Sequence, residues 1–128
     1  MYDPYEHAFV LDIEVIHRKI RTANAMWLPD HNVIVIRDGM KASYDQCALA
    51  HEIGHAALGH ADDSPKNEVL ADRYAAERMV EADRCRDLMR WAPDIARLAL
   101  ELGVTTRLLR AYLRMHPVNE YREPTSAA

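Results

Sequence analysis

Residues 43–59 read Ser-Tyr-Asp-Gln-Cys-Ala-Leu-Ala-His-Glu-Ile-Gly-His-Ala-Ala-Leu-Gly, which is the clearest helical segment of the chain. Good helix formers fill positions 44–58, and Gly59 is a typical helix stop. Ser43, followed three residues later by Gln46, matches a capping box at a helix N-terminus. We therefore expect one helix here, capped at Ser43, with the rest of the chain arranged around it.

Inside this helix, His51-Glu52-Ile53-Gly54-His55 forms an HExxH motif. Four residues are slightly more than one helical turn, so both imidazoles project from one face and can bind a single tetrahedral Zn²⁺. Glu52, turned by about 100° from His51, can reach a water at the open coordination position. The alternative is a chance pattern on a solvated face, but the apolar neighbours indicate a buried helix, where unpaired His and Glu side chains would be costly. We predict one zinc ion per chain, with Glu52 as the catalytic base.

A third protein ligand is required, and Glu68 is the better candidate. It lies thirteen residues after His55 and forms an ExxxD pattern with Asp72. Residues at i and i+4 share a helix face, so Glu68 could bind the metal while Asp72 accepts the N–H of a ligating imidazole. The other interpretation is a surface acidic pair, with His60 as the third ligand. Cys47 also lies one turn before the motif, although a packed core thiol is the simpler reading.

Elements on both sides of the central helix indicate an α+β fold. We expect a short helix over 4–10, a strand over 13–20, and strands Ala25–Leu28 and Val33–Ile36 flanking a Pro-Asp-His-Asn turn. Helices are expected over 66–81, 84–91, 94–102 and 105–115. We predict a small, mainly antiparallel three-stranded sheet packed on the HExxH helix and a Glu-ligand helix, followed by a C-terminal helical bundle.

The 128 residues suit one domain with a small helical appendage. We predict a zincin-like core over 1–82, a helix-turn-helix-like unit over 83–116 and a flexible tail over 117–128. Residues 84–116 contain seven Arg and three acidic residues, which gives this segment a formal charge of +4. Because the whole chain has a net charge of −4, the other residues together carry −8. The C-terminal unit is therefore a basic part of an acidic protein.

Composition also indicates the compartment. The two cysteines have no CxxC spacing, which suits a reducing cytosol, and the acidic N-terminus does not resemble a signal peptide. No apolar stretch approaches the roughly 20 residues of a membrane span. We expect a soluble, cytoplasmic protein with no membrane partner.

The chain resembles the ImmA/IrrE family of metallopeptidases, which are found beside repressor genes in phages, mobile elements and bacteria. The resemblance covers roughly residues 4–115 and depends on Trp27-Leu-Pro-Asp30, on Ala48-Leu-Ala-His-Glu-Ile-Gly-His55, and on Glu68-x-x-Ala-Asp-Arg-Tyr-Ala-Ala76. It implies a minimal thermolysin-like zincin in which His51, His55 and Glu68 bind zinc and Glu52 is the base. It also implies cleavage of a helix-turn-helix repressor. The family's Leu-Leu-Met-Pro-like run is replaced here by residues 78–81, Arg-Met-Val-Glu.

The segment from Ile95 to Leu109 is similar to a helix-turn-helix, with a small residue at Ala99 and a turn at Gly103. Three arginines on its second helix could contact phosphates or a protein partner: Arg107, Arg110 and Arg114. The alternative is a helical prop whose arginines are solvated. Because the rest of the chain is acidic, DNA is the less favoured partner.

These observations favour a zinc-dependent endopeptidase acting on a regulatory protein. The resemblance implies that its substrate is a helix-turn-helix repressor of a phage or mobile element. The alternative is a non-catalytic regulator that binds DNA or a repressor through its basic C-terminal helices. The transition-state donor stays open among four residues: Tyr74, His60, Tyr44 and His31. Strand 33–36 could pair a free edge with an extended substrate, or simply fill the sheet.

Overall fold

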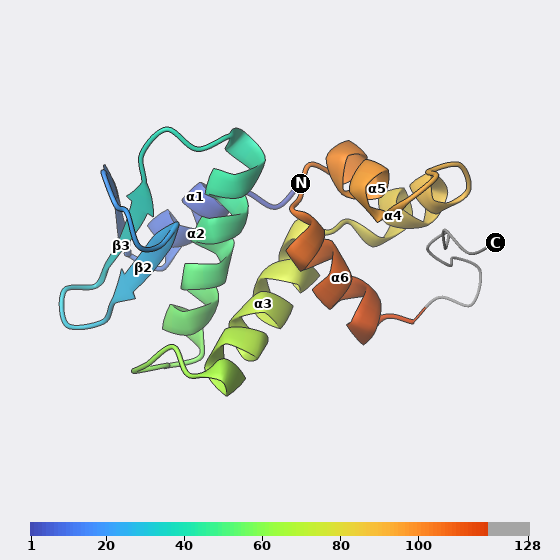
Figure 1. The fold of residues 1–128 in the computed structure, drawn as a ribbon. Coiled ribbons are helices and arrows are strands. Elements are labelled where there is room, and N and C mark those ends of the chain that lie inside the picture. The colour runs from blue at the N-terminus through green and yellow to red at the C-terminus, as the bar shows by residue number, and fades with distance from the viewer. Residues whose placement is uncertain (118–128) are drawn as a thin grey trace.

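The computed structural model describes residues 1–117 of the chain, and the elements of this part form an α+β fold (Figure 1). Their bounds are α1 Pro4–Val10, β1 Glu14–Arg18, β2 Ala25–Leu28, β3 Val33–Arg37, α2 Ala42–Ala57, α3 Pro65–Met79, α4 Ala82–Met89, α5 Ile95–Leu102 and α6 Thr106–Met115. The predicted fold class and the order of its elements are confirmed. The flexible tail predicted over 117–128 lies, from residue 118 onward, outside the described residues.

The sheet has the strand order β1-β3-β2, which differs from the prediction. β3 pairs antiparallel with β2 through a hairpin, but it pairs parallel with β1, so the sheet is mixed rather than mainly antiparallel. The physical reason is that β3 inserts between β1 and β2. Its continuous apolar run Val-Ile-Val-Ile suits a central strand. Of the two roles left open for strand 33–36, a free edge for a substrate is wrong, because both edges of β3 are paired, and a strand that fills the sheet is confirmed.

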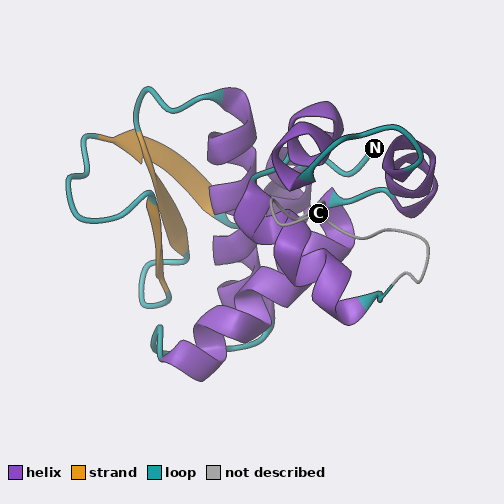
Figure 2. Cartoon of the chain, turned by 45° about the vertical axis from the view of Figure 1, so that its right-hand side comes forward, coloured by secondary structure: helices purple, strands orange, loops and turns teal. Residues whose placement is uncertain are grey.

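One face of the sheet packs on α2, and the helices lie together on that side of the molecule (Figure 2). Ile34 and Ile36 from β3 are fully buried in a core with Leu49 and Ile53 from α2. Polar contacts fix α1 and β1 beside the first turn of α2: Tyr5 donates a hydrogen bond to Asp45, and His17 Nε2 lies 3.0 Å from Asp45 Oδ2. The sheet and α1 therefore contact the HExxH helix from its first turn at Asp45 to Ile53.

The start of α2 corrects the capping prediction. The N-cap is Lys41, which makes no side-chain cap, and Ser43 is already inside the helix. The N–H of Asp45 donates to the Lys41 carbonyl at 2.9 Å, which closes the first turn two residues earlier than predicted. The acidic Asp45 in that turn carries the charge sign that favours a helix N-terminus.

Helix α3 lies very close to α2 because residue 54 is glycine. A Cβ built on Gly54 would lie 3.1 Å from the Ala71 carbonyl oxygen and 3.2 Å from the Cβ of Tyr74. The N-terminus of α3 is fixed by Pro65 in the first turn and by Ser64, whose hydroxyl accepts from the N–H of Asn67 at 3.3 Å. This close packing brings the first two turns of α3 against the motif on α2.

The C-terminal helices share one hydrophobic core with α2 and α3. Cys47 and Ala75 belong to the same buried cluster as Leu98 on α5 and Leu109 on α6. Helices α5 and α6 are joined at Gly103, whose φ of 72° is the left-handed conformation that ends a helix. The predicted boundary near residue 82 stays a prediction, as does the helix-turn-helix character of this pair. Among residues 1–117, the helices are too short or too polar to cross a membrane.

Candidate metal centre

The two histidines of the motif face each other across one turn of α2. Their Nε2 atoms lie 3.1 Å apart, and one donor atom from each of His51, Glu52 and His55 lies within 4.8 Å of the other two. The group could hold a metal ion. His55 is the more buried imidazole, with 5% of its side chain exposed. The helical periodicity of the sequence therefore produces the paired imidazoles that the motif predicts.

Glu68 from α3 reaches the same point. Its Oε1 lies 2.6 Å from His55 Nε2 and 3.2 Å from His51 Nε2, closer than the 4.0 Å between Glu52 Oε2 and His51 Nε2. Burial acts to raise the pKa of Glu68, but the two imidazoles outweigh it and lower the pKa. The carboxylate form, which is the metal-binding form, is thus the favoured one.

The three converging atoms fit one zinc ion. With sides of 3.1, 3.2 and 2.6 Å, the triangle of two Nε2 atoms and Oε1 has a circumscribed radius of about 1.7 Å. Zinc binds nitrogen and carboxylate oxygen at about 2.0–2.2 Å. Because that distance exceeds the radius, points at bonding distance from all three atoms exist just outside their plane. The donor set of two imidazoles and one carboxylate also suits zinc.

Asp72 holds His51 from the other side of the ring. The Nδ1 of His51 lies 2.8 Å from Asp72 Oδ1, which places the imidazole proton on Nδ1 and leaves the Nε2 lone pair for a metal. Burial acts to raise the pKa of Asp72, but the hydrogen bond and charge of His51, with Arg107, lower it overall. Burial likewise acts to lower the pKa of His51, and the neighbouring carboxylates outweigh it and raise that pKa.

Glu52 is placed beside the paired imidazoles rather than between them. It is buried, with 7% exposure, and burial is the largest cause that raises its pKa to about 7. The charge of His51 and a hydrogen bond from the Trp27 backbone oppose this shift. A carboxyl group that titrates near neutral pH can both accept and return a proton, as a general base and acid must.

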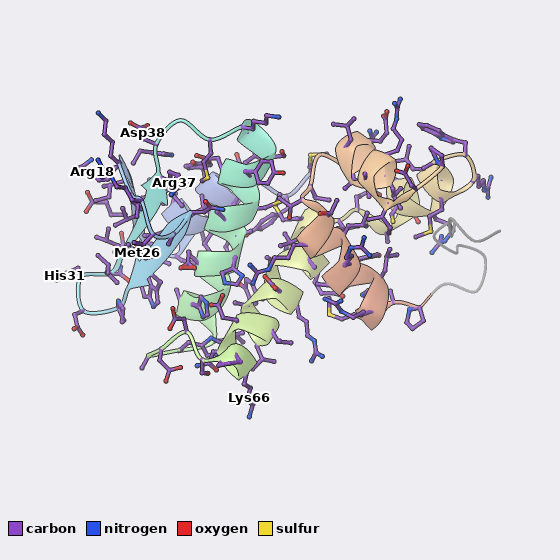
Figure 3. The ribbon with its side chains drawn as sticks, in the orientation of Figure 1. Arg18, Met26, His31, Arg37, Asp38 and Lys66 are labelled. Carbon is purple, nitrogen blue, oxygen red and sulfur yellow. The ribbon has the colours of Figure 1, made fainter. Side chains whose placement is uncertain are left out.

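The site opens into a cleft of about 790 Å³. Its walls come from β2 and the preceding loop, from α2, from the loop after α2, and from the starts of α3 and α6. Of the four predicted donor candidates, Tyr44 and His60 line this cleft. Tyr74 instead stacks on His7 with Arg78 over its ring, and His31 lies on the outer turn of the hairpin, far from α3 (Figure 3). The structure therefore does not bring these last two to the metal centre.

Arg107 is a residue of this centre that the sequence did not predict there. It reaches back from α6, with Nε donating to Asp72 Oδ2 at 2.9 Å and Nη2 lying 3.6 Å from Glu68 Oε2. Arg110 and Arg114, further along α6, are exposed. No local pattern could reveal the contact, because Arg107 and Asp72 are 35 residues apart. Arg107 contacts one oxygen of Asp72 and one oxygen of Glu68, on the side away from the paired imidazoles. The predicted contacts of Arg107, Arg110 and Arg114 with nucleic acid or a protein partner stay predictions.

Cys47 packs in the core. The thiol is buried, and desolvation raises its pKa, which disfavours the thiolate that a metal would bind. The geometry of this site therefore favours Glu68, whose carboxylate already lies against both imidazoles, as the third donor.

Comparison with known proteins gives one partial similarity. No family model matches the chain. Over 61 residues it is 43% identical to the urease accessory protein UreD of Sinorhizobium medicae (strain WSM419), a match that covers 48% of this chain and 20% of that protein. The chain thus spans about a fifth of the length of this relative, which does not place it in a family. The resemblance to the ImmA/IrrE family stays a prediction.

Proposed function

We propose that this protein is a zinc-dependent peptidase that hydrolyses a peptide bond in a regulatory protein. The observation that carries the proposal is the convergence of His51 Nε2, His55 Nε2 and Glu68 Oε1 at 2.6–3.2 Å, with Glu52 buried beside them. Three protein donors on one open cleft are typical of a catalytic rather than a structural zinc site, which has four.

Zinc, when bound, supplies Lewis-acid polarisation of a carbonyl and lowers the pKa of water. The protein supplies the proton transfers. Glu52 accepts a proton from the attacking water and returns it to the amine that leaves, and its buried position beside the paired imidazoles places it for both transfers. Asp72 and Arg107 keep the ligand side chains in place, so little reorganisation is needed during the reaction.

An extended substrate has a binding edge on β2. Residues 25–27 of this strand line the cleft beside Glu52, and within residues 1–117 β2 pairs only with β3, on its other side. A peptide added to the free edge of β2 would gain main-chain hydrogen bonds and pass over the metal centre. The edge proposed from sequence thus moves from β3 to its neighbour.

The proposed substrate is a helix-turn-helix repressor of a phage or mobile element. This part of the proposal is supported by the resemblance to ImmA/IrrE metallopeptidases in the motif on α2 and in the Glu68–Ala76 segment. The cleaved segment of the substrate must be able to adopt an extended conformation, such as a linker between two folded parts, because only an extended backbone can pair with a strand.

The test combines the purified protein with candidate helix-turn-helix repressors, beginning with any that is encoded beside its gene. Wild-type protein with zinc should yield a discrete fragment, and EDTA should abolish it. Glu52→Gln should retain one zinc per chain yet yield no fragment, because the amide cannot accept the proton. Glu14→Gln, on exposed β1, is the matched control and should cleave normally. Full cleavage by Glu52→Gln would remove Glu52 from the mechanism, and cleavage unaffected by EDTA would refute a metallopeptidase.

A further inference from the structure

His60 lies directly behind His55, on the edge of the ring that faces away from the metal centre. The Nδ1 atoms of the two imidazoles are 2.9 Å apart, and the ring planes meet at 65°. The His55 Nε2 atom, on the opposite edge, is the one that meets His51 and Glu68. His60 is therefore not positioned as a third ligand, although the sequence left that role open.

The local chain path fixes this position. Helix α2 ends with Gly59 in the left-handed conformation, at φ 72°, so the backbone turns back on the helix. The N–H of His60 then donates to the carbonyl of His55 at 2.9 Å. Main chain and side chain of His60 thus both contact His55.

When neutral His55 binds a metal through Nε2, only one pair of tautomers is compatible with a hydrogen bond between His55 and His60. The metal needs the Nε2 lone pair, so the single proton of a neutral His55 must be on Nδ1. That N–H then donates to the lone pair of His60 Nδ1, and His60 carries its own proton on Nε2. A ligating imidazole with its second nitrogen bonded to an acceptor is held in one tautomer and one ring orientation.

We propose that His60 is a positioning residue that holds His55 in the metal-binding tautomer, as Asp72 does for His51. The inference rests on the metal site of the proposed function but not on peptide cleavage. The two ligand histidines are then oriented by different groups, a carboxylate for His51 and a neutral imidazole for His55. The neutral acceptor adds no further charge to a site that already holds Glu52, Glu68 and Asp72.

The test replaces His60 with asparagine and with leucine. An asparagine amide oxygen is the same number of bonds from Cβ as Nδ1 and can accept the same hydrogen bond, whereas leucine cannot accept one. Zinc dissociation constants are measured by competition with a chromophoric chelator. We expect His60→Leu to bind zinc about 10- to 100-fold more weakly, the usual effect of losing an outer partner, and His60→Asn to stay near wild type.

Long-range ¹H–¹⁵N spectra of the zinc-loaded proteins give a second readout. The Nδ1 proton of His55 should be slow to exchange in wild type and His60→Asn, and lost to exchange in His60→Leu. Zinc affinity in His60→Leu equal to wild type, or equal losses in both variants, would overturn the proposal. Intact zinc binding and His55 tautomer without any peptide cleavage would refute the proposed function while leaving the role of His60 supported.

Discussion

Replacing Glu52 with glutamine should stabilise the metal-free protein, by an amount that grows with pH. The pKa of Glu52 is raised from 4.5 to about 7, mainly by burial. A raised carboxyl pKa means that the folded state prefers the protonated form. The preference of the folded state for protonated Glu52 adds to the free energy of unfolding. This contribution is fully present below pH 4.5 and is lost as the pH rises toward 7. At about 1.4 kcal/mol for each pH unit between the two values, the charged carboxylate costs the fold about 3 kcal/mol above pH 7.

Glutamine has the same shape, can accept the hydrogen bond from Trp27 and never ionises. Urea unfolding in EDTA should therefore show Glu52→Gln more stable than wild type by under about 1 kcal/mol at pH 5 and by about 3 kcal/mol at pH 8. Glu14→Gln, at an exposed site, should show no comparable trend. A difference between Glu52→Gln and wild type that stays constant from pH 5 to pH 8, or a less stable variant at pH 8, would refute the buried-carboxylate argument.

Three further substitutions probe the site. Glu68→Ala removes a donor, so zinc affinity measured by chelator competition should fall by more than the about 10- to 100-fold typical of outer partners; unchanged affinity would exclude Glu68 as a ligand. Arg107→Gln should weaken zinc binding by about 10-fold, because Asp72 and Glu68 lose a partner that orients them, whereas exposed Arg114→Gln should not weaken it. Loss of a positive charge by itself would favour a bound cation, so unchanged or tighter zinc binding in Arg107→Gln would refute this role. Gly54→Ala should lower both stability, by about 1 kcal/mol, and zinc affinity, because overpacking outweighs the gain in helix propensity. Gly39→Ala, with open space around it but positive φ, should lower stability alone.

The parts of the site that follow local periodicity could be predicted from the sequence. His51 and His55 share a face because they are four residues apart on one helix, and Glu68 and Asp72 do so for the same reason on α3. Pro65 and the Ser64 cap mark the start of that second helix from local chemistry alone. These signals depend on neighbours within one or two turns.

The predictions that were wrong or missing concern contacts between residues distant in sequence. The parallel pairing of β1 with β3 follows from insertion of β3 between two earlier strands, although the all-apolar run of β3 was a signal for a central position. The first turn of α2 begins at the Lys41 cap, before Ser43, and Asp45 in that turn contacts Tyr5 of α1 and His17 of β1, which are 40 and 28 residues away. Arg107 contacts Asp72 because α6 packs on α3. The local sequence pattern does not indicate this helix packing.

Anomalous diffraction at the zinc absorption edge, from crystals of the zinc-loaded protein, tests the metal centre most directly. We predict one peak per chain, at about 2.0–2.2 Å from His51 Nε2, His55 Nε2 and an oxygen of Glu68, with Glu52 and His60 outside bonding distance. A peak bonded to Glu52 or His60 in place of Glu68, or no peak at this site in folded, zinc-saturated protein, would contradict the account.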